Sequence, residues 1–218
     1  MPQIFRPYAD SVARATLVTL LIGPFAAIGI AYWTMRSNYI TDQTITLGQP
    51  VPFSHAHHVG GLGLDCRYCH SAVEKSAIAG IPPTHTCMTC HSQLYTQTEM
   101  LAPVRASLAE NKPIRWNKVN KLPDYVYFDH SIHIAKGVGC TTCHGPVDRM
   151  PLMRQAAPLT MGWCLNCHRD PAQYLRPATA VFDPDWRPPA DQREQGRKLA
   201  AANHIDNPHL SDCSVCHR

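Results

Sequence analysis

The 218-residue sequence lacks two signatures of proteins that bind polyanions. It has no glycine-rich phosphate-binding loop, which argues against a nucleotide-dependent enzyme. It has no basic run with interleaved aromatic residues, so a formal charge of +4 does not indicate a nucleic-acid partner. Extended segments are also scarce, and residues 125–128 are the best candidate for a strand. None of the ten cysteines lies outside one repeated motif, so we look for the chemistry of the chain in that motif.

The motif is Cys-x-x-Cys-His, and it occurs five times. Its cysteines are Cys66, Cys69, Cys87, Cys90, Cys140, Cys143, Cys164, Cys167, Cys213 and Cys216, and its histidines are His70, His91, His144, His168 and His217. Two thiols three positions apart can each form a thioether with a haem vinyl group, and the next residue places an imidazole under the iron. Zinc ribbons and redox dithiols do not need that histidine. The sequence therefore predicts five c-type haems, with these five histidines as proximal ligands.

An uncharged segment of 21 residues lies between Arg14 and Arg36. As a helix it would be about 31 Å long, enough to cross the hydrocarbon core of a membrane. Tyr32 and Trp33 stand at one end, where interfacial aromatic residues are favoured. The segment is longer than the apolar part of a usual signal peptide, and no small-x-small cleavage site follows it. We therefore expect a retained transmembrane anchor over residues 15–35.

The orientation of this anchor follows from charge and from haem chemistry. Arg6 and Arg14 precede the span and Arg36 follows it, a slight bias toward a cytoplasmic N-terminus. Bacteria attach covalent haem outside the cytoplasmic membrane, where unprotected paired cysteines would oxidise. We expect a single-pass protein of the cytoplasmic membrane, with residues 1–14 inside and the haem domain on the periplasmic side.

Residues 37–218 provide only about 36 residues for each predicted haem, too few for an ordinary hydrophobic core beside each porphyrin. The 19 prolines favour loops, and short helices are expected at 99–111, at 191–202 and around the attachment sites. The predicted fold class is a multihaem cytochrome c. It would be mostly irregular, with short α-helices packed on haems, little β-structure and one N-terminal transmembrane helix.

An internal repeat divides the haem domain. The pattern Phe-x-His-x-x-His precedes the first and third motifs, at Phe53–His58 and Phe128–His133. A second haem motif follows in each unit. The predicted parts are a linker at 36–52, a di-haem module at 53–95, a linker at 96–127, a second di-haem module at 128–172 and a tail with the fifth haem at 173–218.

The paired histidines of this repeat are candidates for distal iron ligands. Histidines at positions i and i+3 project from one side of a helical turn, yet diverge enough to serve different irons. We therefore predict that His55, His58, His130 and His133 are distal ligands, and that the preceding phenylalanines pack on porphyrin. The alternative is four surface or core histidines with no metal.

Five proximal and four distal histidines leave one iron without a sixth ligand. Met161 is the leading candidate, and a methionine sulfur would raise the reduction potential of that haem relative to a second imidazole. The other candidates are Met150, Met153, His57, His85, His204 and His209. Because every motif ends in histidine and distal ligands are plentiful, no axial position is predicted to stay open for a substrate. We assign no catalytic residue and favour an electron carrier over a self-contained enzyme.

Four longer segments resemble a known family: FSHAHHVGGLGLDCRYCHSAVE, AGIPPTHTCMTCHS, LPDYVYFDHSIH and PLTMGWCLNCHR. They are similar to the pentahaem cytochrome c subunit of alternative complex III, a membrane quinol oxidase. The resemblance covers about residues 50–172, the anchor and the final haem site. It implies an iron–sulfur subunit, a monohaem cytochrome c subunit, multispan quinol-binding membrane subunits and membrane lipid as partners. It also implies that electrons pass from quinol toward a soluble carrier or terminal oxidase.

Three other functions are weighed against this one. The first is a stand-alone membrane-anchored quinol dehydrogenase of nitrate or nitrite respiration, in which quinol meets the first haem directly. Here Cys66 lies 30 positions after Arg36, which disfavours that chemistry. The second is a multihaem reductase, which would bind carbon monoxide or nitrite when reduced. The third is a passive scaffold, which reduction by quinol within the complex would exclude.

Overall fold

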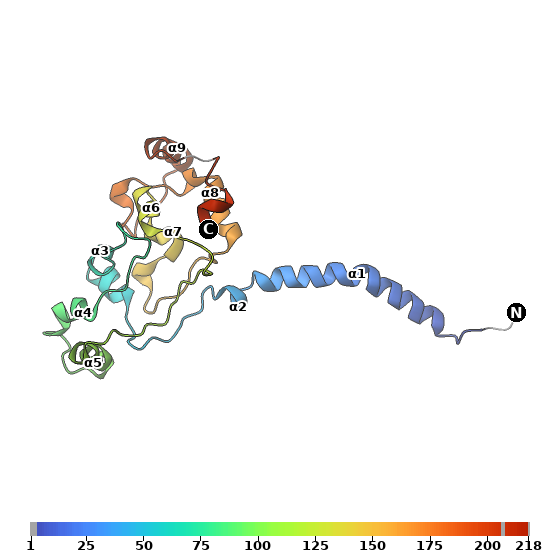
Figure 1. Cartoon of the computed structure of the whole chain (residues 1–218), viewed down its shortest axis with the longest axis horizontal. Helices are drawn as coiled ribbons and strands as arrows, with labels where there is room; N and C mark the ends of the chain where they lie inside the picture. The colour runs from blue at the N-terminus through green and yellow to red at the C-terminus, as the bar shows by residue number, and fades with distance from the viewer. Residues whose placement is uncertain (1–3, 206–207, 218) are drawn as a thin grey trace. The chain divides into compact units, whose positions relative to one another are not determined.

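The computed structural model describes residues 4–205 and 208–217. The chain forms two compact units, Met1–Asp42 and Gln43–Arg218. The first unit consists mainly of one long helix, and the second consists of short helices joined by irregular segments (Figure 1). The expectation of short helices in a mostly irregular domain, preceded by one apolar N-terminal helix, is confirmed.

Helix α1 (Ala9–Met35) is long and apolar enough to cross a membrane, by length and composition. Its 27 residues correspond to about 40 Å. It begins before the predicted span because its polar first turn, which includes Asp10, is also helical. Pro24 lies inside the helix, and the apolar side chains are exposed, as with Leu21 at 69%. After the helix, the Arg36 guanidinium lies 3.8 Å from the ring centre of Tyr32. The short helix α2 (Asn38–Thr41) completes this unit.

Eight α-helices are assigned in the described part of the second unit, and five of them carry Cys-x-x-Cys-His motifs. They are α3 (Cys66–Cys69), α4 (Thr84–His91), α5 (Ala102–Glu110), α6 (His130–Ala135), α7 (Cys140–His144), α8 (Met161–Arg169), α9 (Gln192–Ala202) and α10 (Cys213–Cys216). A π-helix, η1 (Ala56–Gly61), and the 3-10 helices η2 (Glu99–Leu101), η3 (Val147–Arg149), η4 (Pro171–Gln173) and η5 (Ala178–Ala180) lie between them. The helices expected at 99–111 and 191–202 are confirmed.

The strand predicted at residues 125–128 is wrong. No strand is assigned within 4–205 or 208–217, where only three isolated bridges occur. The Tyr127 backbone N–H instead donates to the Cys216 carbonyl at 2.9 Å. This segment therefore contacts the fifth attachment site and forms no ladder with a neighbouring strand.

The second unit buries few apolar side chains of its own. In the described residues the buried ones are Val51, Val73, Val104, Val138, Met150, Ala157, Ala172, Leu175 and Val181. Most are small, and a unit of this size would ordinarily need more apolar burial to be stable. The sparse core therefore agrees with the expectation that covalently bound porphyrin supplies part of the apolar interior.

Candidate haem sites

Each Cys-x-x-Cys pair lies on a helical turn, so its two sulfurs project from one side of the helix. At the first site, Asp65 caps the turn because its carboxylate accepts from the Arg67 backbone N–H at 2.8 Å. The His70 N–H then donates to the Cys66 carbonyl at 2.9 Å, and His217 repeats this bond with Cys213. The local fold thus presents two thiols together and turns the next histidine in a fixed direction.

The five proximal histidines all have Nδ1 within hydrogen-bond distance of a partner. Four of them face backbone carbonyls: His70 faces Gly80 at 2.6 Å, His91 faces Leu94 at 3.2 Å, His168 faces Leu210 at 2.8 Å and His217 faces Tyr125 at 3.1 Å. Because a carbonyl can only accept, Nδ1 carries the proton and Nε2 keeps its lone pair. This is the tautomer in which Nε2 can ligate a metal, with the second nitrogen oriented by the protein.

His144 differs, because its partner is a side chain. The Asn120 amide nitrogen lies 3.1 Å from His144 Nδ1, and Asn120 Oδ1 is buried without a partner. The two ends of a carboxamide have the same shape, so an amide turned by 180° places Oδ1 against the imidazole. In that orientation both the orphaned oxygen and the His144 N–H are satisfied.

The predicted repeat reappears as two matching clusters of rings. Phe53 stacks on His58 at 4.4 Å between ring centres and meets His55 edge-on at 4.9 Å. In the second copy of the repeat Phe128 stacks on His133 at 4.5 Å and meets His130 edge-on at 4.8 Å. The phenylalanines therefore order the histidine pairs directly, in addition to any contact with porphyrin.

Three of the predicted distal histidines also have Nδ1 bonded to a backbone carbonyl. The acceptors are Ser54 for His58 at 2.9 Å, Ala77 for His130 at 2.8 Å and Asp129 for His133 at 2.7 Å. Their Nε2 atoms are therefore free to bind iron, as in the proximal histidines. His55 is the exception, since its Nδ1 is buried without a hydrogen-bond partner among the described residues.

Three distal histidines face three proximal histidines across a gap of constant width. The ring centres are 6.2 Å apart for His58 and His91, 6.3 Å for His130 and His144, and 6.1 Å for His133 and His168. A metal–imidazole bond of about 2 Å on each side gives ring centres about 6 Å apart. These residues therefore fit two axial ligands of one haem iron at the second, third and fourth motifs.

His55 lies close enough to His70 for the charge of one imidazole to affect the other. Desolvation, then the charges of His70 and His58, lowers the pKa of His55 to about 4. Desolvation is also the main cause that lowers the pKa of His133, and that of His144 to about 4. At neutral pH these imidazoles are uncharged, which is the form that binds a metal.

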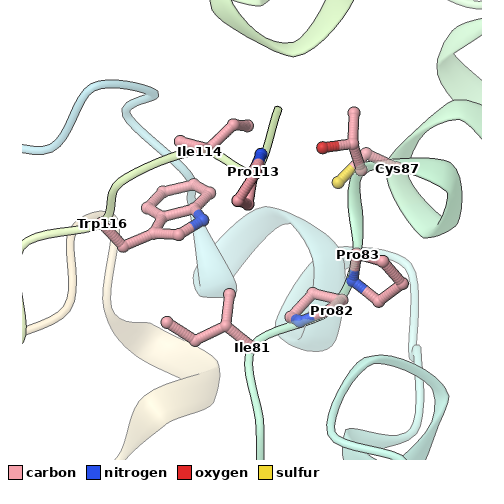
Figure 2. A pocket seen from close by; sticks show the side chains of 8 residues that line it. Ile81, Pro82, Pro83, Cys87, Pro113, Ile114 and Trp116 are labelled. Carbon is pink, nitrogen blue, oxygen red and sulfur yellow. The ribbon is translucent and has the colours of Figure 1, made fainter. Parts of the chain in front are cut away.

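The second attachment site opens onto an apolar cavity of about 360 Å³ (Figure 2). Cys87 on α4 lines it on one side, and Pro113, Ile114 and Trp116 from the segment after α5 line it on the other. An apolar wall beside an attachment cysteine is suited to a porphyrin edge. The cavity is therefore suited to one edge of the macrocycle that Cys87 and Cys90 would hold.

Comparison with known proteins agrees with this geometry. Residues 126–218 match the family described as cytochrome c7 and related cytochrome c. The chain is also 32% identical over 206 residues to the "menaquinone reductase, multiheme cytochrome c subunit" of Nitratidesulfovibrio vulgaris strain Hildenborough, covering 90% of this chain and 88% of that protein. The chain belongs to the multihaem cytochromes c. Its cofactor is c-type haem.

Sequence reasoning missed two residues of this multihaem cytochrome c that support the third site. One is Asn120, and the other is Arg176, which is 4% exposed. The Arg176 guanidinium donates to the Thr141 hydroxyl at 2.6 Å and the Thr142 hydroxyl at 3.3 Å, inside the third motif. It also lies 4.5 Å from the centre of the Trp186 ring. Asn120 is 24 residues from His144 and Arg176 is 35 residues from Thr141, so only the fold brings them to this site.

The candidates for the last axial ligand differ in exposure. Met150 has no exposed surface and is covered by protein, so its sulfur has no free side for an iron. Met161 is 68% exposed and lies at the first residue of α8, one turn before Cys164. His57, His85, His204 and His209 are exposed, and His209 pairs with Asp212 at 3.2 Å.

Proposed function

We propose that this multihaem cytochrome c carries five c-type haems, one on each Cys-x-x-Cys-His motif. The axial pairs would be His70 with His55, His91 with His58, His144 with His130, and His168 with His133. Three ring separations near 6 Å support this assignment, together with the lowering of the His55 pKa by desolvation and by the nearby His70. The di-haem modules at 53–95 and 128–172 and the tail at 173–218 remain part of the proposal.

For the fifth haem we propose His217 and Met161 as axial ligands. Met161 and Cys164 lie three residues apart on α8 and so share a face, and Cys164 is close enough to Cys216 for charge on one to affect the other. Replacing Met161 with leucine should abolish the near-infrared sulfur-to-iron band. An unchanged spectrum would exclude Met161 and leave the exposed histidines as candidates.

We propose electron transfer as the function, in a quinone-linked complex of the cytoplasmic membrane. C-type haem supplies one-electron transfer when bound. The observation that carries the proposal is the opposed histidine pairs, because two protein ligands at one iron leave no axial position for a substrate. The chain itself would orient most of the imidazoles through Nδ1, keep His55, His133 and His144 neutral by burial and exclude water with apolar side chains. The retained anchor over 15–35 would place the haem domain on the periplasmic side.

The complex that the sequence segments favour is alternative complex III. Its iron–sulfur subunit, monohaem cytochrome c subunit and multispan quinol-binding subunits would be the partners, and electrons would leave quinol toward a soluble carrier or terminal oxidase. In the second candidate function, electrons flow in the opposite direction, from a reduced cytochrome to quinone. The relative is named a menaquinone reductase, and 32% identity over 90% of the chain supports a related complex here.

Purification in mild detergent distinguishes these functions. Under the proposal the protein copurifies with iron–sulfur and multispan subunits, and the complex oxidises menaquinol with a c-type cytochrome as acceptor. Net reduction of menaquinone by a reduced cytochrome would favour the second candidate. If the protein purified alone and oxidised menaquinol unaided, it would be a stand-alone quinol dehydrogenase.

A further inference from the structure

Motifs that are neighbours in space are not all neighbours in sequence. The first and second motifs are joined side by side, because Tyr68 and Thr89, the third residue of each motif, share a hydrogen bond of 2.8 Å between their hydroxyls. Cys69 is also close enough to Cys87 for charge on that thiol to affect it. In the mature protein each sulfur would hold a haem edge, so contacts between motifs report which haems are adjacent.

The first and third motifs meet through equivalent residues. The thiols of Cys66 and Cys140, the first cysteine of each motif, are close enough for each to shift the pKa of the other. In addition, a backbone N–H of each module donates a hydrogen bond to a backbone carbonyl of the other module. Ala56 N–H donates to the Met150 carbonyl at 3.0 Å, and Ser131 N–H donates to the Ser76 carbonyl at 3.3 Å.

These two backbone bonds correspond position by position. Ala56 follows His55 as Ser131 follows His130, and Ser76 lies six residues after His70 as Met150 lies six after His144. In each module the same position donates and the same position accepts. A contact of this kind, in which equivalent residues meet in both directions, has two-fold symmetry. The two modules are therefore related by a pseudo-two-fold axis that passes between the equivalent thiols of the first and third motifs.

The remaining contacts extend the second module on its outer side. His130 and His133 lie one turn apart on α6, and their ring centres lie 6.3 Å from His144 of the third motif and 6.1 Å from His168 of the fourth. The third and fourth sites are therefore adjacent. The carbonyl of Leu210, just before the fifth motif, accepts from His168 of the fourth at 2.8 Å.

Exposure independently identifies the ends of this series. Among the ten cysteines, only Cys90 and Cys213 are exposed, and the other eight are partly covered. Cys90 belongs to the second motif and Cys213 to the fifth. The three motifs between them in the series have no exposed cysteine.

We propose that the haem sites form one unbranched line in the order second, first, third, fourth, fifth, and that the second and fifth sites are its terminals for partner proteins. The inference rests on the proposed electron-transfer function. The pseudo-two-fold axis relates the first site to the third and the second site to the fourth. The fifth site has no symmetry-related counterpart and lengthens the line only beyond the fourth site. The two terminals therefore differ, which gives the line distinct points for electron entry and exit.

The iron positions in the mature, detergent-purified complex test the order directly, by electron cryo-microscopy with each iron assigned to its motif. We expect the four shortest iron–iron distances to join second to first, first to third, third to fourth and fourth to fifth. A third iron nearer to the second than to the first would overturn the proposal, as would a fifth iron whose nearest neighbour is not the fourth. Electron transfer by the complex would be measured separately, so failure of the order is distinguishable from failure of the proposed function.

Two variants test the terminals, Cys87→Ala/Cys90→Ala and Cys213→Ala/Cys216→Ala. Each should lose one haem by mass and leave four that dithionite still reduces. We expect each to lower electron throughput of the complex at least a hundredfold, because each removes one end of the line. A variant with four haems and undiminished throughput would contradict the assignment of that site as a terminal.

Discussion

At the scale of single residues, the third site shows how the protein sets the properties of a ligand. Four proximal histidines donate to backbone carbonyls, which substitution cannot readily change, whereas His144 meets the Asn120 side chain. Hydrogen bonds to the outer nitrogen of a metal-bound histidine raise its basicity. The Asn120 amide is therefore a point where the reduction potential of one haem can be altered without touching its ligands.

We expect Asn120→Asp to lower the midpoint potential of one haem, because a carboxylate acceptor makes the imidazole more basic and favours the oxidised iron. A tenfold change in the equilibrium constant corresponds to about 59 mV for one electron, so a shift of that order is readily measured in an optical redox titration. Asn111→Asp is the matched control, since Asn111 is exposed and distant in sequence from any motif. A titration curve unchanged in Asn120→Asp, or shifted upward, would contradict this role.

A second residue-scale prediction concerns stability. Arg176→Gln should lower the free energy of unfolding by about 2–4 kcal/mol, because several hydrogen bonds are lost and buried acceptors are left unpaired. The carbonyl of Asp183, which accepts from Arg176 at 3.1 Å, is one of these acceptors. Arg197→Gln, at an exposed position of α9, should change stability by less than about 0.5 kcal/mol. Denaturant unfolding of both variants would show the contrast, and equal stabilities would contradict it.

At the scale of elements, η1 presents adjacent histidines with different environments. His58 faces His91 at 6.2 Å, whereas His57 is exposed. We therefore expect His58→Ala to open one haem in five to carbon monoxide after reduction, and His57→Ala to open none. Optical spectra with and without carbon monoxide measure this. If carbon monoxide bound to the His57 variant and not to the His58 variant, His57 would be the iron ligand and His58 would not.

The sequence predicted the repeated elements well but could not pair them. Phe53 and Phe128 pack on their histidine pairs, whereas the sequence predicted only that they pack on porphyrin. Which distal histidine faces which proximal one depends on contacts across the fold, such as His130 with Ala77. Asn120 and Arg176 carry no motif, so no local pattern could identify them. The strand at 125–128 was wrong because apolar and aromatic residues there pack beside the fifth motif, a tertiary contact that propensity does not reveal.

At the scale of the whole molecule, α1 exposes apolar side chains along its length. Such a surface is unfavourable in water and favourable in lipid. We expect the full chain to stay with membranes through high salt and alkaline washes and to be released by detergent. Release by salt alone would mean that the helix does not anchor the protein.

The central claim is that five haems are bound covalently, four of them between paired histidines, so that the chain carries electrons. Intact-mass measurement of the mature protein tests it most directly, after acid–acetone treatment to remove any haem that is not covalently bound. The account predicts the mass of the polypeptide plus five haems. The mass of the polypeptide alone, or a colourless polypeptide after the treatment, would contradict it.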